Sequence, residues 1–127
     1  MNAVQVVEQF WALMSTNDFK AVGTVLSDDF ILQWPQSGEL IRGRDNFARV
    51  NEEYPSHGRW IFTVHRLFGD EHEVVSEVSI TDGLQQARAI SFFTVAGGLI
   101  TQMVEYWPEV YEAAANRSHL VEKITVI

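Results

Sequence analysis

The N-terminal residues carry apolar side chains at helical spacing. Apolar positions recur at i, i+4 and i+7 and predict an amphipathic helix over residues 3–14. The polar residues 15–17 end this helix, and Thr16 or Asn17 can cap a second short helix. The apolar positions of the two predicted helices are Ala3, Val7, Phe10, Trp11 and Met14, and then Phe19, Val22 and Leu26.

Strand-like patterns dominate the rest of the chain. Residues 30–34 alternate as in a strand that Pro35 closes, a short strand comes next over 39–42, and a third helix is expected over 43–54. Segments rich in β-branched and aromatic residues then predict four strands over 60–67, 74–81, 87–95 and 99–107. Asp-Gly and Gly-Gly dipeptides between them favour tight turns. Helices before a meander indicate a single α+β domain over residues 1–127, with N-terminal helices packed on a curved mixed or antiparallel sheet.

The expected turns allow the strands to be paired. A two-residue loop at Gly97-Gly98 places Ala96 opposite Leu99, and one at Asp82-Gly83 places Glu77 opposite Arg88. A β-bulge would exchange the two faces beyond it. One predicted face carries Trp60, Phe62, Val75, Glu77, Arg88, Ile90, Phe92, Met103, Glu105 and Trp107; the other carries Ile61, Thr63, Leu67, Val78, Ile80, Ala89, Ser91, Phe93, Val104 and Tyr106.

Both predicted faces are largely apolar, whereas a sheet with one face in water alternates cleanly. The helices can cover only one of them. We therefore expect a homodimer through the outer sheet face, which on this pairing includes Ile61, Phe93, Val104 and Tyr106. The C-terminal residues 109–127 are also too apolar for a free end, and we expect them to pack on their own subunit or on the partner.

Composition and charge narrow the partners. The net charge is −8, which opposes phosphate binding and argues against nucleic acid. No apolar run is long enough to span a membrane, and the N-terminus lacks the pattern of a signal peptide. The absence of cysteine excludes disulfides and cysteine-ligated metals and fits a reducing compartment. We therefore expect a cytoplasmic protein.

Three charged side chains on one predicted face are the candidates for chemistry. Glu77 and Glu105 lie among aromatic residues, and a carboxylate in an apolar pocket can act as a general acid or base near neutral pH. Arg88 could orient a glutamate or bind substrate. The alternative is structural: Glu77 and Arg88 form a cross-strand ion pair, and Glu105 is a backbone-satisfied or interface residue.

Aromatic residues are numerous enough to line a ligand cavity. The binding candidates are Trp11, Trp34, Tyr54, Phe62, Phe92 and Trp107, although each alone is more often a core residue. The four histidines fall in no metal-binding motif, so we expect no metal and no other cofactor.

The segment 105–109, Glu-Tyr-Trp-Pro-Glu, follows Gly98-Leu99-Ile100. It is the most specific of several stretches that resemble the SnoaL-like (polyketide-cyclase-like) proteins of the nuclear transport factor 2-like superfamily. Glu77 within 75–78, Ser91-Phe92, Arg117 and Val121-Glu122 are also similar, whereas Asn116 and Leu120 stand where the resemblance would place tryptophans.

The resemblance implies a cone-shaped fold with a pocket between sheet and helices, usually in a homodimer. It does not imply one reaction, because this fold serves many activities. A ketosteroid-isomerase pattern would place a catalytic aspartate near the end of the first strand, where this chain has Trp34, and a second acid near Ile90 or Ser91, neither of which can serve as an acid. Ketosteroid-isomerase chemistry is therefore not expected from the resemblance.

Two functions are therefore expected. The first is a small-molecule pocket protein acting on a compact, largely apolar molecule, as a cofactor-free isomerase, cyclase, dehydratase or hydrolase with acid–base carboxylates. The second is a non-catalytic ligand-binding or dimerisation module. A perturbed carboxylate facing an open cavity would favour the first, and a closed core with Glu77 and Arg88 fully paired would favour the second.

Overall fold

The first predicted helix is present as α1 (Ala3–Met14) in the computed structural model, which describes residues 1–125. A capping box starts it: the Asn2 side chain accepts from the backbone N–H of Gln5, and the Gln5 side chain accepts from the N–H of Asn2. Its buried face carries Ala3, Val6, Val7, Phe10, Trp11 and Met14.

The second predicted helix is shorter than expected. It is the 3-10 helix η1 (Ala21–Val25), and Leu26 already begins strand β1 (Leu26–Trp34). The expectation that Leu26 belongs to this helix is therefore wrong. Gly23 weakens helix formation within this segment, and Leu26 instead pairs with Ile100 of another strand.

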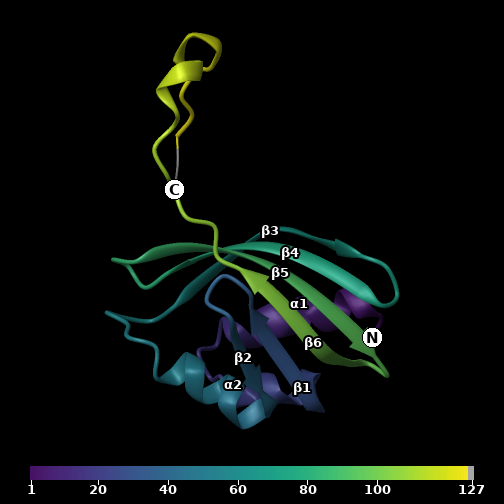
Figure 1. The fold of residues 1–127 in the computed structure, drawn as a ribbon. Coiled ribbons are helices and arrows are strands. Elements are labelled where there is room, and N and C mark those ends of the chain that lie inside the picture. The colour runs from purple at the N-terminus through teal and green to yellow at the C-terminus, as the bar shows by residue number, and fades with distance from the viewer. Residues whose placement is uncertain (126–127) are drawn as a thin grey trace.

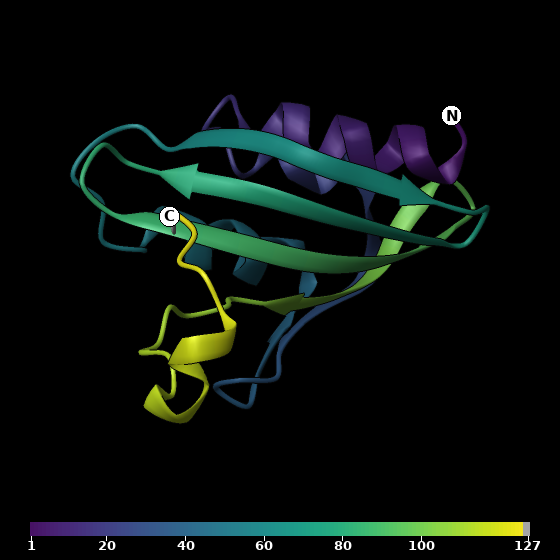
Figure 2. The same cartoon turned by 90° about the horizontal axis from the view of Figure 1, so that it is seen from above.

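Within residues 1–125, the sheet has six strands in the order β2-β1-β6-β5-β4-β3. Strand β1 pairs parallel with β6 and all other neighbours are antiparallel, so the sheet is mixed. Helices α1 and α2 (Gly43–Glu52) lie on its concave side (Figures 1 and 2). This arrangement confirms the α+β prediction. The other strands are β2 (Glu39–Arg42), β3 (Ile61–Gly69), β4 (Glu73–Thr81), β5 (Gln86–Ala96) and β6 (Leu99–Tyr106).

The pairing of β4 with β5 keeps the predicted faces but shifts the predicted register by two residues. Glu77 pairs with Ile90, and Arg88 with Ser79, because the connection between the strands spans residues 82–85 instead of two residues. Glu77 and Arg88 still form an ion pair along the diagonal, with 2.6 Å between Oε2 and Nη1.

The pairing of β5 with β6 departs further. The turn is as predicted, with Ala96 opposite Leu99, but a bulge at Thr101 shifts the register. Beyond it, Phe93 faces Met103 and Ser91 faces Glu105. Counting back from the predicted turn without a bulge would pair Phe92 with Met103 and Ile90 with Glu105, and both of these pairs are therefore wrong.

Because of two bulges, several side chains lie on the other face of the sheet from the one predicted. A second one, between Val64 and Arg66 of β3, turns Phe62 to the concave side opposite Ile80, while Arg66 stays opposite Glu77. The concave face unites residues that the prediction had divided between the two faces. It includes Phe62, Ser76, Val78, Ile80, Ala89, Ser91, Phe93, Met103 and Glu105.

The opposite, convex side of β3–β6, here called the outer face, is apolar and accessible. Ile61, Phe68, Phe92 and Tyr106 are all exposed on it. Phe93, which the prediction placed on the dimer face, is fully buried in the core and is a correction to that prediction.

The C-terminal segment leaves the domain after β6. Residues 108–125, including the 3-10 helix η2 (Ala115–Leu120), are exposed throughout, and Figure 1 shows the segment projecting away from the sheet. The expectation that they pack on their own subunit is wrong for the described residues; Val126 and Ile127 lie outside these. Within residues 1–125, no helix is long and apolar enough to cross a membrane.

Candidate functional site

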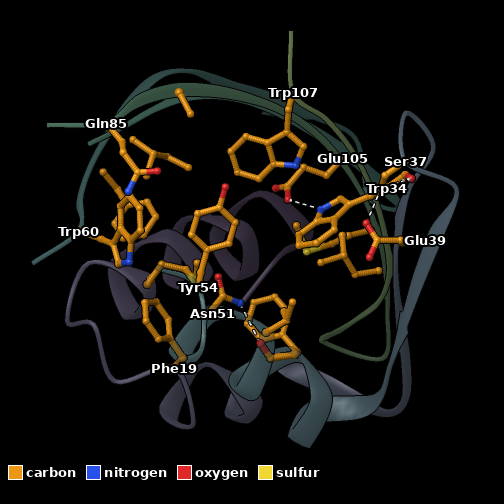
Figure 3. A pocket seen from close by; sticks show the side chains of 18 of the residues that line it. Phe19, Trp34, Ser37, Glu39, Asn51, Tyr54, Trp60, Gln85, Glu105 and Trp107 are labelled. Carbon is orange, nitrogen blue, oxygen red and sulfur yellow. Dashed lines mark hydrogen bonds between the residues drawn. The ribbon is translucent and has the colours of Figure 1, made fainter. Parts of the chain in front are cut away.

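A cavity of about 540 Å³ opens between the helices and the concave face of the sheet (Figure 3). Its deep wall is apolar, with Phe10 and Trp11 from α1, Phe47 from α2, and Leu32 and Met103 from the central strands. Because β1 and β6 are interior strands, the side chains that they direct into the cavity rest on a rigid base.

Glu105 is the one ionisable side chain of this cavity that is buried within the described part of the chain, with a relative exposure of 6%. Its Oε1 accepts a hydrogen bond of 3.0 Å from Trp34 Nε1, and its Oε2 accepts one of 2.6 Å from Ser91 Oγ. Burial raises the pKa of Glu105, and the hydrogen bonds from Ser91 and Trp34 oppose this shift without cancelling it.

Two pairs of aromatic rings stand around the cavity. The ring centroids of Trp34 and Trp107 are 6.3 Å apart, and those of Tyr54 and Trp60 are 5.9 Å apart; both pairs meet edge to face. Figure 3 shows Trp34 and Trp107 beside Glu105, Trp60 on the other side, and Tyr54 projecting between them.

Polar contacts hold these aromatic residues in place. Gln36, in the turn after β1, accepts from the backbone N–H of Trp107 and donates to its carbonyl oxygen over 3.1 Å. Asn17 exchanges two hydrogen bonds of 2.8 Å with the backbone of Trp60. It does so from a left-handed conformation, with φ at 61°, which asparagine tolerates better than most residues.

The Asp82 carboxylate stabilises the loop of residues 82–85 at one end of the cavity. It accepts from the backbone N–H groups of His57, Leu84 and Gln85 and from the Gln85 side chain, and Gln85 lines the cavity. Burial acts to raise the pKa of Asp82, but these hydrogen bonds outweigh it and hold the pKa well below the ordinary aspartate value.

Most of the predicted site residues line the cavity. Trp11, Trp34, Tyr54, Phe62, Trp107 and Glu105 all do so, although the Trp11 indole N–H is already bonded to Ser76 Oγ at 3.0 Å.

Glu77, Arg88 and Phe92 do not line it. They lie on the outer face, where Glu77 accepts from Arg66 at 2.9 Å and Arg88 at 2.6 Å. The expectation that Glu77, Arg88 and Glu105 share one face is wrong, because the Thr101 bulge turns Glu105 inward.

Sequence reasoning missed the partner of Glu105. Ser91 was assigned to the opposite face, and only the Thr101 bulge brings it beside Glu105. Asn51 and Gln85 also line the cavity, and no motif distinguishes them in the sequence. Among residues 1–125, no three His, Asp or Glu side chains gather closely enough to hold a metal ion.

The charged residues of the cavity are all acidic. Besides Glu105 they are Glu39 and Glu109, both exposed, and the described lining includes no Lys, Arg or His. Of the two, Glu39 accepts a hydrogen bond of 2.6 Å from Ser37 Oγ beside Trp34 (Figure 3).

Solved structures share this architecture. A candidate ketosteroid isomerase from Kribbella flavida DSM 17836 is 30% identical, with a TM-score of 0.88 over 96% of this chain and 89% of that one. An NTF-2 like protein of unknown function from Burkholderia xenovorans LB400 is 28% identical, with a TM-score of 0.78 over 95% and 94%. An LEH-like epoxide hydrolase from M. tuberculosis, 24% identical with a TM-score of 0.67 over 84% and 82%, shares the fold.

No curated protein matches the chain significantly. The SnoaL-like domain family matches residues 7–103, which include most of α1, all of α2 and nearly all of the sheet. This chain therefore belongs to the SnoaL-like domain family, and its fold is that of the nuclear transport factor 2-like proteins.

Proposed function

We propose that this protein is a cofactor-free acid–base enzyme acting on a compact, largely apolar small molecule, with Glu105 as the proton-transfer group. The observation that carries the proposal is the Glu105 carboxyl group, buried and with a raised pKa, in the wall of an aromatic cavity. Catalytic acids and bases work best when their pKa lies near the working pH, and burial is the usual means of raising that of a glutamate.

The hydrogen bonds of Glu105 distinguish its two oxygens. An indole N–H can only donate, so Oε1 faces Trp34 as an acceptor whether or not the carboxyl group is protonated. A hydroxyl can donate or accept, so Ser91 can adapt to a proton on Oε2. Oε2 is therefore the oxygen that gives and takes the proton.

The cavity limits the substrate. Small-molecule sites commonly enclose about 300 to 1,000 Å³ and are mostly apolar with a few polar groups. At about 540 Å³, this cavity suits a molecule of one or two rings. Isomerisation, cyclisation, dehydration and epoxide opening all need a proton to be moved on such a molecule, and in this proposal Glu105 moves it.

Similarity to the Kribbella flavida candidate ketosteroid isomerase supports an isomerase within this group. The carboxyl group of this chain lies on β6, however, and the position near the end of β1 holds Trp34. The substrate therefore meets its acid from the β6 side of the cavity.

Proton abstraction next to a carbonyl is the step to test. Wild-type protein should accelerate exchange of α-protons of small cyclic ketones in D₂O, followed by ¹H NMR. Glu105→Gln should lower the rate by about 10²- to 10⁴-fold, the usual contribution of a positioned acid or base. Glu77→Gln, on the outer face, is the matched control and should leave the rate unchanged. Equal rates for wild type and Glu105→Gln would contradict the proposal.

A non-catalytic ligand-binding or dimerisation module is the alternative. The paired oxygens of Glu105 favour it, because a buried carboxylate with two donors can be a purely structural acceptor. Glu105→Gln would then lower the melting temperature and leave any exchange rate at the spontaneous value.

We also propose that the protein forms a homodimer through the outer face. The outer face exposes Ile61, Phe68, Phe92 and Tyr106, and large exposed apolar patches commonly mark interaction sites. A second copy of the chain on this face would leave the cavity accessible, because the two lie on opposite sides of the sheet. The cytoplasm is the compartment that we propose, since the chain has no cysteine.

A further inference from the structure

We infer that the cavity selects organic cations: molecules with a compact apolar body and an ammonium group. This inference rests on the proposed small-molecule function and names the class of ligand. Two independent features of the walls carry it, the sign of their charges and the arrangement of their aromatic rings.

The charges of the lining all have one sign. Glu39, Glu105 and Glu109 line the cavity, and among the described residues no basic side chain does. Two arginines of the neighbouring helix are paired with carboxylates, Arg44 with Asp28 and Arg49 with Glu53. Arg59 keeps its charge, but it donates to the carbonyl oxygen of Ser15 and is not among the described lining residues. An anionic ligand would therefore find no counter-charge in the described lining.

The field of the whole chain acts in the same direction. The net charge is −8, and a cleft lined by one sign of charge between low-dielectric walls concentrates ions of the opposite sign. A neutral ligand gains nothing from this field, and an anion is repelled by it.

The aromatic rings supply the second feature. Trp34, Trp107, Tyr54 and Trp60 come from β1, the end of β6, and the loop between α2 and β3, yet their rings surround one space (Figure 3). A cation over the face of a tryptophan or tyrosine ring is attracted by about 0.5 to 2 kcal/mol, and several rings around one cation form the usual site for alkylammonium groups. Edge-to-face packing in each pair fixes the orientation of the rings.

Glu105 adds a counter-ion at the end of this space. A cation beside a buried carboxylate favours its ionised form and offsets part of the cost of burying the charge. The indole of Trp34 both holds Glu105 through Nε1 and contributes a ring to the wall, so the carboxylate and the ring lie side by side.

Three probes of similar shape, one cationic, one neutral and one anionic, test the inference. The probes are 3-phenylpropylamine, which is a cation at pH 7, 3-phenylpropan-1-ol and 3-phenylpropanoate, each titrated into the full chain by calorimetry. The ammonium should bind at least tenfold more tightly than the alcohol, and the carboxylate should bind most weakly. An alcohol or carboxylate that binds as tightly as the ammonium would overturn the inference.

Variants of the two exposed glutamates of the cavity separate the effect of charge on binding from the effect of shape. Glu39→Gln combined with Glu109→Gln removes two exposed charges, so folding should be retained, and the ratio of ammonium to alcohol affinity should fall severalfold. Glu112→Gln, an exposed residue outside the lining, should leave the ratio unchanged. An unchanged ratio in the double variant would overturn the role given to these charges.

The outcomes also separate this inference from the proposed function. If the alcohol binds as well as the ammonium while Glu105→Gln still slows ketone exchange, only the inferred preference for cations fails. If none of the three probes binds, the inference fails, and the ketone-exchange assay still decides the proposed function by itself.

Discussion

The Trp34 indole nitrogen lies 3.0 Å from Oε1 of Glu105 and joins strands β1 and β6 across the parallel pair of the sheet. These residues are 71 positions apart in the chain, so only the folded sheet brings them together. The bond places a proton-donating ring N–H against the one buried carboxyl group of the cavity within residues 1–125. Trp34 is therefore a positioning residue for Glu105 as well as part of the wall.

Trp34→Phe removes this donor and keeps an aromatic ring. The hydrogen bond favours the ionised carboxylate, so its loss should raise the pKa of Glu105 further. A buried acceptor left without a partner should also lower the free energy of unfolding by about 1 to 3 kcal/mol. Carboxyl ¹³C NMR titration and urea unfolding measure the two effects. Trp107→Phe is the control, because it replaces a neighbouring indole by a smaller ring and leaves the hydrogen bond between Trp34 and Glu105 intact. A pKa unchanged in Trp34→Phe but shifted in Trp107→Phe would contradict this role.

Asp82→Asn should change how stability depends on pH. The folded-state pKa of Asp82 is lowered, so its contribution to stability is present above the unfolded value of about 3.9 and is lost as the pH falls below that value. The variant should be less stable than wild type at pH 7 and should lose less stability between pH 5 and pH 2. Thermal unfolding across this range measures both.

Asp28→Asn is the control for that experiment, because Asp28 is an exposed carboxylate with a single ion-pair partner, Arg44. Its stability curve should follow that of wild type. Parallel curves for wild type and Asp82→Asn would show that the hydrogen bonds of Asp82 do not stabilise the fold.

The outer face should hold a second copy of the chain. Light scattering at micromolar concentration should give twice the chain mass of 14.5 kDa. Phe92→Ser combined with Tyr106→Ser removes two exposed rings whose centroids are 6.2 Å apart and should give the monomer mass. Leu84→Ser, an equally apolar exposed change in the 82–85 loop, should leave the dimer intact. A wild-type mass near 14.5 kDa would refute the dimer.

The C-terminal segment should be protected by the partner subunit. Val110, Tyr111, Leu120, Val121 and Ile124 are all exposed in the single chain, although each is apolar enough to favour burial. Limited proteolysis of wild-type protein should therefore trim the segment slowly, and trimming of the Phe92→Ser/Tyr106→Ser variant should be fast. Equally rapid trimming of both proteins, with no loss of stability, would show that the segment docks nowhere.

The sequence was sufficient for the element order and for several contacts. Glycines at 97 and 98 adopt positive φ in the predicted turn, and Ala96 faces Leu99 as expected. Hydrophobic periodicity likewise predicted the buried face of α1. These features are local, so residue type and spacing determine them.

The composition of the site could not be predicted in the same way. Thr101 of β6 forms a bulge, and no glycine marks it in the sequence. The pairing of β6 with its other neighbour, β1, is also irregular between Ile100 and Gln102. One extra residue moves Glu105 from the face of Glu77 and Arg88 to the face of Ser91 and Phe93. The Asp82 loop was missed for a related reason: its length depends on an aspartate side chain that binds the N–H groups of Leu84 and Gln85.

The central claim is that burial in the cavity raises the pKa of the Glu105 carboxyl group and so prepares it to exchange a proton with a substrate. Carboxyl ¹³C NMR of wild type and Glu105→Gln, titrated from pH 3 to pH 9, tests it most directly, because the resonance absent from the variant belongs to Glu105. That resonance should titrate above the ordinary glutamate pKa of about 4.3. A midpoint at or below that value would show that the hydrogen bonds from Trp34 and Ser91 outweigh burial, and Glu105 would then be a permanently charged structural acceptor.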